Sequence, residues 1–293
     1  MTPLKNIVVG IDFSPVCDQA LMEAERIAKW SDAELTATHV LDDGLVESLK
    51  AQESDLRSKI TSGVESEVRS RIRTVLGSDP AAEAGFVIGD PFKELEKEIA
   101  HHSAELLVLG SGHDPGHIGA VASKCVRRGK CDVLLVREGQ RLPLRKVVAC
   151  VDFSETSRKA VETAFSFAKN NGATLELIYV FKPINEYVTE KFYFIPVSPK
   201  VFEDTDAIAL DKVRKELATF VDPIAKEFSG VQSSKVILQS LDHKQAIIDY
   251  SKKHDADLVV LGKHGKAQSI VLGTTAERVV NHASCSVLVV SPA

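Results

Sequence analysis

Short apolar runs alternate along the chain with longer segments whose apolar residues recur every three or four positions. Runs such as 6–11 (NIVVGI), 106–110 (LLVLG) and 132–136 (DVLLV) are almost entirely apolar. Such runs are typical of strands buried on both faces of a parallel sheet, and the 3.6-residue periodicity between them predicts helices. The alternation predicts an α/β fold with helices on both faces of the sheet.

This pattern occurs twice along the chain. Residues 5–40 and 145–180 align without a gap, and each copy contains the triplet Asp-Phe-Ser directly after its first apolar run. A repeat of this length predicts two tandem domains and not a solenoid of short units. We place the domains at 1–140 and 141–293, with a linker over about 137–145.

Each half supplies about five strands, so right-handed crossovers predict two doubly wound, Rossmann-like domains, each with a mainly parallel five-stranded sheet. Ligands of such sheets bind outside the carboxyl ends of the strands. Asp12, Asp152 and the loops after 106–110 and 258–262 all fall at that edge. The expected topology therefore points to a binding site before any family is considered.

The helix signals are clearest after the first strand of each copy. Ser14 followed by Pro15 predicts an N-cap and a first helical residue, and Ser154 is placed to cap the equivalent helix. The copies differ most in their inserts. Residues 45–76 predict a long charged helix, and 204–228 predict a helix that follows a stretch rich in aromatic residues and proline.

Composition excludes several classes of function. The chain has 293 residues, of which 44% are hydrophobic, and its net charge is −5, so it has no basic surplus for nucleic acid or anionic membranes. No apolar run approaches the length of a membrane span, and the N-terminus does not resemble a secretory signal. The five cysteines form no CxxC pair, which favours buried thiols in a reducing cytoplasm.

The candidate chemistry lies in the loop after 258–262. Its glycines are Gly262, Gly265 and Gly273, and its cationic candidates are Lys263, His264 and Lys266. Glycines permit close backbone approach to a ligand, and the cations favour an anion. Thr274 with Glu277 three residues later matches a capping box, so a helix begins there and its N-terminal amides suit an anion. The alternative is that the glycines only form turns and Thr274 only caps a helix.

At these residues the sequence resembles the universal stress protein family in its tandem two-domain form. The resemblance rests on VDFS, DADLVVLGKHG and LGTTAERVVNHASCSVLVV, and on weaker counterparts in the first half. It implies ATP or another adenine nucleotide as the ligand, and Mg²⁺ can accompany it. The implied phosphate and ribose contacts are Gly262, Gly265, Gly273 and Thr274. The resemblance also implies that Asp152 lies at the adenosine end and that the backbone of Val180 meets the adenine.

Both halves depart from the family's phosphate loop, G-x2-G-x9-G-[S/T]. Seven residues separate Gly265 from Gly273, where the family has nine. The first half keeps Asp12, Val40, Gly110 and Gly119 at the matching positions. It has His113 in place of the second glycine, Ala120 in place of the terminal hydroxyl, and Asp114 where phosphates would lie. We therefore predict a degenerate first site and a nucleotide site in the second domain.

Other motifs carry weaker hypotheses. His113 and His117 have a metal-binding spacing only in a helix, and Pro115 between them favours a loop, so no metal site is predicted. The aromatic stretch within 181–200 is either a lid, a partner surface or an insert that packs on its own domain. No protease, hydrolase or Walker motif is present, and no catalytic residue is assigned.

Three functions remain open from sequence. The first is a cytoplasmic stress-response protein that binds an adenine nucleotide in its second domain as a regulatory ligand. The second is a weak ATPase that uses the same pocket with Asp152 as base, and the third is a nucleotide-free interaction scaffold. The resemblance also implies an intrachain pseudo-dimer whose last strands, 132–136 and 286–290, pair edge to edge. Further partners are other proteins or a second copy of the chain.

Overall fold

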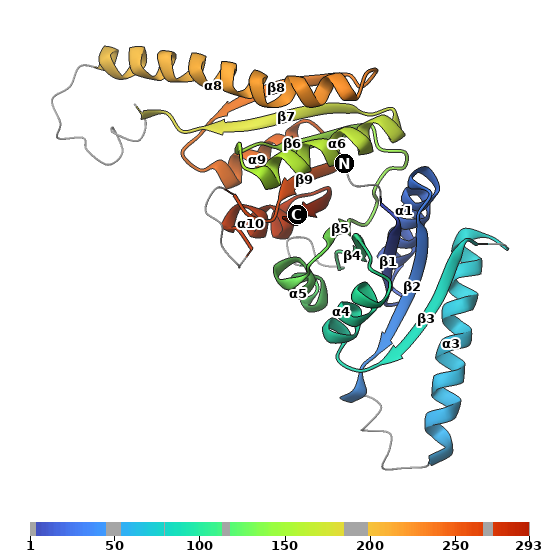
Figure 1. The fold of residues 1–293 in the computed structure, drawn as a ribbon. Coiled ribbons are helices and arrows are strands. Elements are labelled where there is room, and N and C mark those ends of the chain that lie inside the picture. The colour runs from blue at the N-terminus through green and yellow to red at the C-terminus, as the bar shows by residue number, and fades with distance from the viewer. Residues whose placement is uncertain are drawn as a thin grey trace. The chain divides into compact units, whose positions relative to one another are not determined.

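The protein is described by a computed structural model covering residues 4–44, 54–78, 80–112, 118–184, 199–265 and 272–292. The chain divides into two compact units, Met1–Leu142 and Pro143–Ala293. Each unit is an α/β sandwich with helices on both faces of its sheet (Figure 1). The α/β class predicted from the alternating pattern is confirmed in both units.

In the first unit the strands take the order β3-β2-β1-β4-β5. The elements are β1 (Asn6–Ile11), α1 (Pro15–Ser31), β2 (Glu34–Leu41), α3 (Ser54–Leu76), β3 (Ala82–Ile88), α4 (Pro91–His101), β4 (Leu106–Gly110), α5 (Ala120–Arg128) and β5 (Asp132–Val136). All four strand pairings are parallel. Helices α1 and α3 contact each other on one face, and α4 and α5 contact each other on the opposite face.

The second unit repeats this topology as β10-β9-β6-β7-β8. Its elements are β6 (Lys146–Cys150), α6 (Glu155–Asn171), β7 (Thr174–Phe181), α8 (Pro199–Glu227), β8 (Ser233–Gln239), α9 (His243–Lys253), β9 (Leu258–Gly262), α10 (Thr274–His282) and β10 (Ser286–Val290). Its four strand pairings are also parallel. The strand order reverses between β6 and β9 in this unit, as it does between β1 and β4 in the first.

The core follows the sequence pattern closely. Every residue of β5 and β10 is buried, as expected for strands covered on both faces. The apolar face of α1, with Ala20, Ala24 and Ile27 at helical spacing, is completely buried. Small residues on this face let the helix lie close to the sheet, which fixes where its N-terminus meets the carboxyl end of β1.

Both predicted caps after the first strands are confirmed. The Ser14 side chain accepts from Cys17 N–H with Pro15 at the first helical position, and Ser154 accepts from Ser157 N–H. Phe13 and Phe153, which precede the caps, have φ of 61° and 62°. The left-handed conformation turns the chain sharply from the strand into the helix. The Asp-Phe-Ser triplet therefore forms the same strand-to-helix turn in both units.

The inserts differ in detail from the prediction. Helix α3 ends where the pattern indicated, and residues 45–53 of the predicted helix lie outside the described residues. Helix α8 begins at Pro199, five residues before the predicted start at 204. The aromatic residues 187–194 also lie outside the described residues. No helix in the described ranges is both long and apolar enough to cross a membrane.

Candidate functional site

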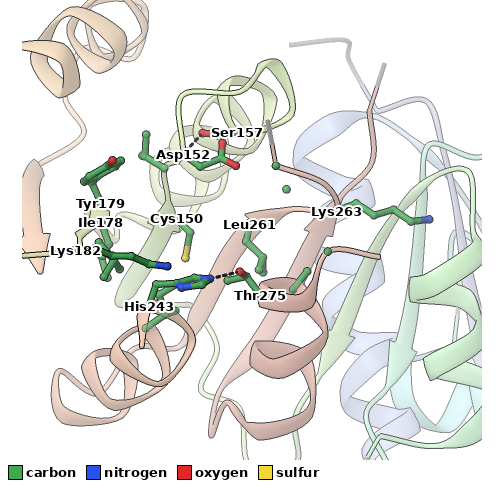
Figure 2. A pocket seen from close by; sticks show the side chains of 17 residues that line it. Cys150, Asp152, Ser157, Ile178, Tyr179, Lys182, His243, Leu261, Lys263 and Thr275 are labelled. Carbon is green, nitrogen blue, oxygen red and sulfur yellow. Dashed lines mark hydrogen bonds between the residues drawn. The ribbon is translucent and has the colours of Figure 1, made fainter. Parts of the chain in front are cut away.

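A cavity of about 370 Å³ opens at the carboxyl ends of β6, β7 and β9 in the second unit (Figure 2). Its walls come from these strands, the loop after β6, and the first residues of α9 and α10. Of the residues predicted to form the site, it brings together Asp152, Val180, Gly262, Lys263, Gly265 and Gly273. The volume falls within the range of small-molecule sites, roughly 300–1,000 Å³.

Asp152 is held in place by the turn that follows β6. Its Oδ1 atom accepts from the N–H of Ser154 at 2.9 Å and from the hydroxyl at 2.6 Å. Its own N–H donates to the hydroxyl of Ser157, which also lines the cavity, at 3.2 Å. These bonds fix one carboxylate oxygen and leave Oδ2 directed toward the glycine loop.

None of the three loop glycines has a left-handed φ, so backbone conformation does not explain them. They are explained instead by neighbouring atoms that leave no room for a side chain. A Cβ atom at Gly265 would lie 2.5 Å from Oδ2 of Asp152. At Gly262 it would lie 2.9 Å from the Thr156 side chain, and at Gly273 it would lie 3.2 Å from the Lys263 carbonyl. A larger residue at any of these positions would fill the cavity or displace its wall.

The start of α10 differs from the predicted capping box. The helix begins at Thr274, so the N-cap is Gly273, and no side chain caps it. Thr274 is one position too late to act as the cap, and Glu277 N–H bonds to the Gly273 carbonyl. The capping-box assignment is therefore wrong, while the predicted helix start is correct. Gly273 has no side chain to cap the first-turn amides of α10, and Thr275 and Ala276 of this turn line the cavity.

The predicted cations contribute less than the sequence indicated. The backbone of Lys263 borders the cavity: its N–H bonds to Val290 and its carbonyl accepts from Gly273. Its side chain is only 5% exposed and points away from Asp152 and Cys150 (Figure 2). His264 and Thr274 are not among the lining residues. Lys266 lies outside the described residues.

Backbone alternation explains how Val180 meets the cavity. The carbonyl of Ile178 accepts from Val151 N–H, so the polar backbone groups of Ile178 point toward β6. Because alternate strand residues point their backbone groups to the same side, those of Val180 point that way too. Strand β6 ends at Cys150, which pairs with Ile178. The N–H and C=O of Val180 therefore face the cavity instead of a strand.

The family assignment follows from comparison with known proteins. Residues 3–137 and 143–291 each match the universal stress protein (Usp) family. The chain belongs to the universal stress protein family. It carries two Usp domains in tandem, which accounts for the repeat in the sequence.

Individual relatives agree with this assignment. A universal stress protein of Methanocaldococcus jannaschii is 30% identical over 164 residues, which cover 53% of this chain and 86% of the relative. One from Thermus aquaticus is 26% identical over 148 residues, covering 50% of this chain and 98% of the relative. The crystal structure of a universal stress protein from Archaeoglobus fulgidus is 20% identical with a TM-score of 0.66, covering 98% of both chains. A functionally unknown protein from Pseudomonas aeruginosa is 18% identical with a TM-score of 0.68, covering 99% of this chain and 93% of that one. The two solved structures support the fold.

Three of the polar residues that border the cavity in the second Usp domain without having been predicted lie together at one end of it. They are Lys182, which follows β7, His243 at the start of α9, and Thr275 in the first turn of α10. His243 Nε2 and Thr275 Oγ1 lie 2.9 Å apart and share a hydrogen bond. A comparison of the two copies could have identified them. None of the three has a residue of the same chemical type at the equivalent position of the first half.

Burial shifts several ionisable groups around the cavity. Desolvation, followed by the charges of Lys182 and Lys244, lowers the pKa of His243, so the neutral imidazole is favoured. Burial and the nearby Asp152 carboxylate raise the pKa of the Cys150 thiol to about 12. Cys150 is therefore a neutral, poorly nucleophilic wall of the site. Burial also raises the pKa of Tyr179, whose ring stacks on Phe153 at 4.8 Å.

The first Usp domain keeps the turn of the site without its polar wall. Asp12 accepts from Ser14 N–H and hydroxyl at 3.0 and 2.5 Å, as Asp152 does from Ser154. Gly119 caps α5 without a side-chain bond, and a Cβ atom at Gly110 would lie 2.8 Å from Val16. Val40 lies in β2 at the position equivalent to Val180. His113, Asp114 and His117 lie outside the described residues, and among those described no group of acidic, His or Cys side chains is arranged to hold a metal ion.

Proposed function

We propose that the second Usp domain binds an adenine nucleotide as a regulatory ligand. The observation that carries this proposal is the convergence of Asp152, the backbone of Val180 and the glycines Gly262, Gly265 and Gly273 on one cavity of about 370 Å³. These groups come from three separate strand ends. They are brought together at the point where the strand order reverses, the usual ligand site of a doubly wound sheet.

The chemistry of the wall fits a nucleotide. The paired N–H and C=O of Val180 offer a donor and an acceptor to the edge of a purine. The Oδ2 atom of Asp152 accepts from a ribose hydroxyl or an exocyclic amine. The first-turn amides of α10, which their N-cap residue Gly273 cannot cap with a side chain, provide partial positive charge for a phosphate.

A regulatory ligand is favoured over a substrate that is turned over. Oδ1 of Asp152, the residue nearest to a role as base, is already engaged by Ser154. The Lys263 ammonium points away from the cavity (Figure 2). His243, the other candidate base that lines the cavity, has its Nε2 atom in a hydrogen bond with Thr275. The wall therefore offers groups for binding and little apparatus for activating water.

Calorimetric titration of the full chain with AMP, ADP and ATP tests the proposal, with released phosphate measured in the same samples. Binding without phosphate release supports a regulatory ligand, and steady release would identify a slow ATPase instead. Gly273→Val should abolish binding because Gly273 contacts the Lys263 carbonyl, whereas Gly119→Val is the matched control with nothing within 4 Å. No heat and no thermal shift with any of the three nucleotides would reject the proposal and favour a nucleotide-free scaffold.

A further inference from the structure

We propose that Lys182, His243 and Thr275 form the phosphate-binding subsite of the second Usp domain, and that this subsite accepts a nucleoside monophosphate-sized anion. The inference rests on the proposed function, because it assumes that the same cavity takes the rest of the nucleotide. It assigns the anion to side chains outside the glycine loop, from three elements that are far apart in sequence.

The three side chains lie together at one end of the cavity. The Lys182 ammonium points toward the His243 ring, and His243 in turn meets the Thr275 hydroxyl at 2.9 Å (Figure 2). They come from the residue after β7, the first residue of α9 and the second residue of α10. A phosphate bound against these three groups would meet an ammonium group, an imidazole and a hydroxyl, all of which can donate hydrogen bonds.

Among the described residues, the charges at this end are mainly cationic. Lys182 contributes the ammonium group of an exposed residue that lines the cavity. Lys244 acts on His243 from α9, and Asp242 opposes it from the position before the helix. Arg278 of α10 acts in turn on Asp242. Asp152, on the wall formed after β6, is the other carboxylate of the cavity.

The side chain of Asp242 is engaged in hydrogen bonds with its own helix. Its side chain caps α9 by accepting from the N–H groups of Lys244 and Gln245, both at 3.1 Å. These bonds lower the pKa of Asp242 and hold its charge against the α9 backbone. The uncapped helix, α10, is the one that carries Thr275. An anion at Thr275 would therefore meet the helix end whose amides no side chain covers.

The first Usp domain lacks all three residues. Asp42 follows β2 where Lys182 follows β7, and Pro91 opens α4 where His243 opens α9. Val121 is the second residue of α5, where Thr275 is the second residue of α10. One copy thus has a cation, an imidazole and a hydroxyl, and the other has a carboxylate, a ring without a donor and an alkyl group. The two copies keep the same turn at Asp12 and Asp152, yet all three of these positions differ between them. This joint difference is expected if only one copy binds a phosphate.

The loop itself offers weaker anchors for a long phosphate chain. Lys263 directs its ammonium away from the cavity. The loop between Gly265 and Gly273 is two residues shorter than the family pattern. Among the residues that the structure describes, Lys182 and His243 are the side chains facing the cavity that can carry positive charge, so a single phosphate near Thr275 is better matched than a triphosphate tail.

Titration of the full chain with adenosine and AMP separates base recognition from phosphate recognition. Wild-type protein should bind AMP more tightly than adenosine. Lys182→Gln and His243→Asn should each weaken AMP about tenfold and leave adenosine within about twofold, because each removes one charged or polar phosphate contact. Lys182→Asp, which introduces the first-domain residue, should weaken AMP further. Lys244→Gln is the matched control, since it removes one positive charge from α9 at a side chain that does not line the cavity.

The outcomes distinguish the two proposals. If wild-type protein prefers AMP to adenosine but Lys182→Gln and His243→Asn bind AMP normally, the subsite is overturned while nucleotide binding stands. If wild-type protein binds neither compound, both proposals fall. A tenfold preference for ATP over AMP in wild-type protein would also overturn the subsite as a monophosphate site. Lys182 is exposed, so its variants test the idea even if His243→Asn unfolds the domain.

Measuring AMP affinity over a pH series distinguishes a phosphate contact of His243 from a purely structural role, which would not change the pH dependence. A phosphate beside the imidazole favours its protonated form, so AMP binding should take up a proton at His243. The AMP affinity of wild-type protein should therefore rise, relative to that of His243→Asn, as the pH falls from about 8 to about 6. Parallel pH profiles for the two proteins would contradict this role, and the comparison cancels the titration of the phosphate itself.

Discussion

Asp152 is joined to Ser154 by two hydrogen bonds to one oxygen, from the N–H at 2.9 Å and from the hydroxyl at 2.6 Å. The same pair joins Asp12 to Ser14 at 3.0 and 2.5 Å. In each copy the serine oxygen then caps the following helix. The aspartate therefore supports the fold in both domains, while in the second domain its other oxygen also faces the cavity.

Replacing the two aspartates separates these roles. Asp152→Ala and Asp12→Ala should each lower the free energy of unfolding by about 1 to 2 kcal/mol, because each removes the bonds that orient a capping serine. Only Asp152→Ala should also weaken AMP binding. Urea unfolding and calorimetry on both variants check this, and equal loss of AMP binding in Asp12→Ala would contradict the assignment of the site to the second domain.

Gly265→Ala should weaken nucleotide binding with little loss of stability. The added Cβ atom would lie 2.5 Å from Oδ2 of Asp152, so the carboxylate must rotate out of its place in the cavity wall. We expect AMP affinity to fall at least about tenfold, which corresponds to about 1.4 kcal/mol. Calorimetry together with the melting temperature measures both effects. Gly119→Ala, where nothing lies within 4 Å of the added atom, is the control.

The ion pair between buried Glu23 and partly exposed Arg26 predicts a pH-dependent loss of stability. Glu23 is 1% exposed, and Arg26 binds both of its oxygens at 2.6 and 2.8 Å. Burial raises the pKa of Glu23 and the bonds to Arg26 lower it, with a net rise. The folded protein therefore holds more protons at this carboxyl than the unfolded chain, so its contribution to stability falls as the pH rises above the ordinary value of 4.5.

Arg26→Ala removes the group that opposes this rise. The free energy of unfolding should drop by about 2 kcal/mol at neutral pH, where the unpaired carboxylate must ionise, and by less near pH 4.5. Urea unfolding at the two pH values measures the difference. Lys29→Ala, which breaks the exposed pair between Lys29 and Glu25, should cost less than about 0.5 kcal/mol. A loss in Arg26→Ala that is the same at both pH values would contradict the argument.

Gly63→Ala should stabilise the first domain. Gly63 lies inside α3, its φ is not left-handed, and nothing lies within 4 Å of an added Cβ atom. Alanine at such a position should raise the free energy of unfolding by about 1 kcal/mol. Gly230→Ala should act in the opposite direction, because Gly230 has a φ of 96° that an alanine rarely adopts. Thermal unfolding of both variants checks the opposite signs.

Much of the site was visible in the sequence because it lies in local motifs. The Asp-Phe-Ser turn and the glycine loop are each read from a few adjacent residues, whereas the role of Val180 was implied by the family resemblance. The capping box failed for a local reason as well: Thr274 and Glu277 have the correct spacing, yet the helix takes Gly273 as its cap. A spacing of three fits both a cap and a first helical residue, so it does not fix the register of the helix start.

The duplication, the α/β class, the parallel strands and the placement of Asp152 near a glycine loop were set by the chain itself, because hydrophobic period and turn chemistry act over a few residues. The direction in which each cationic side chain points was not determined by such local patterns. Lys182, His243 and Thr275 are separated by 61 and 32 positions and meet only because parallel strands return to the same edge of the sheet. Lys263 stands in the loop as a cation in sequence, yet packing turns its ammonium away from the cavity. Long flexible side chains take their direction from neighbours that are distant in sequence, and for this reason the folded domain had to be seen before its charge could be assigned.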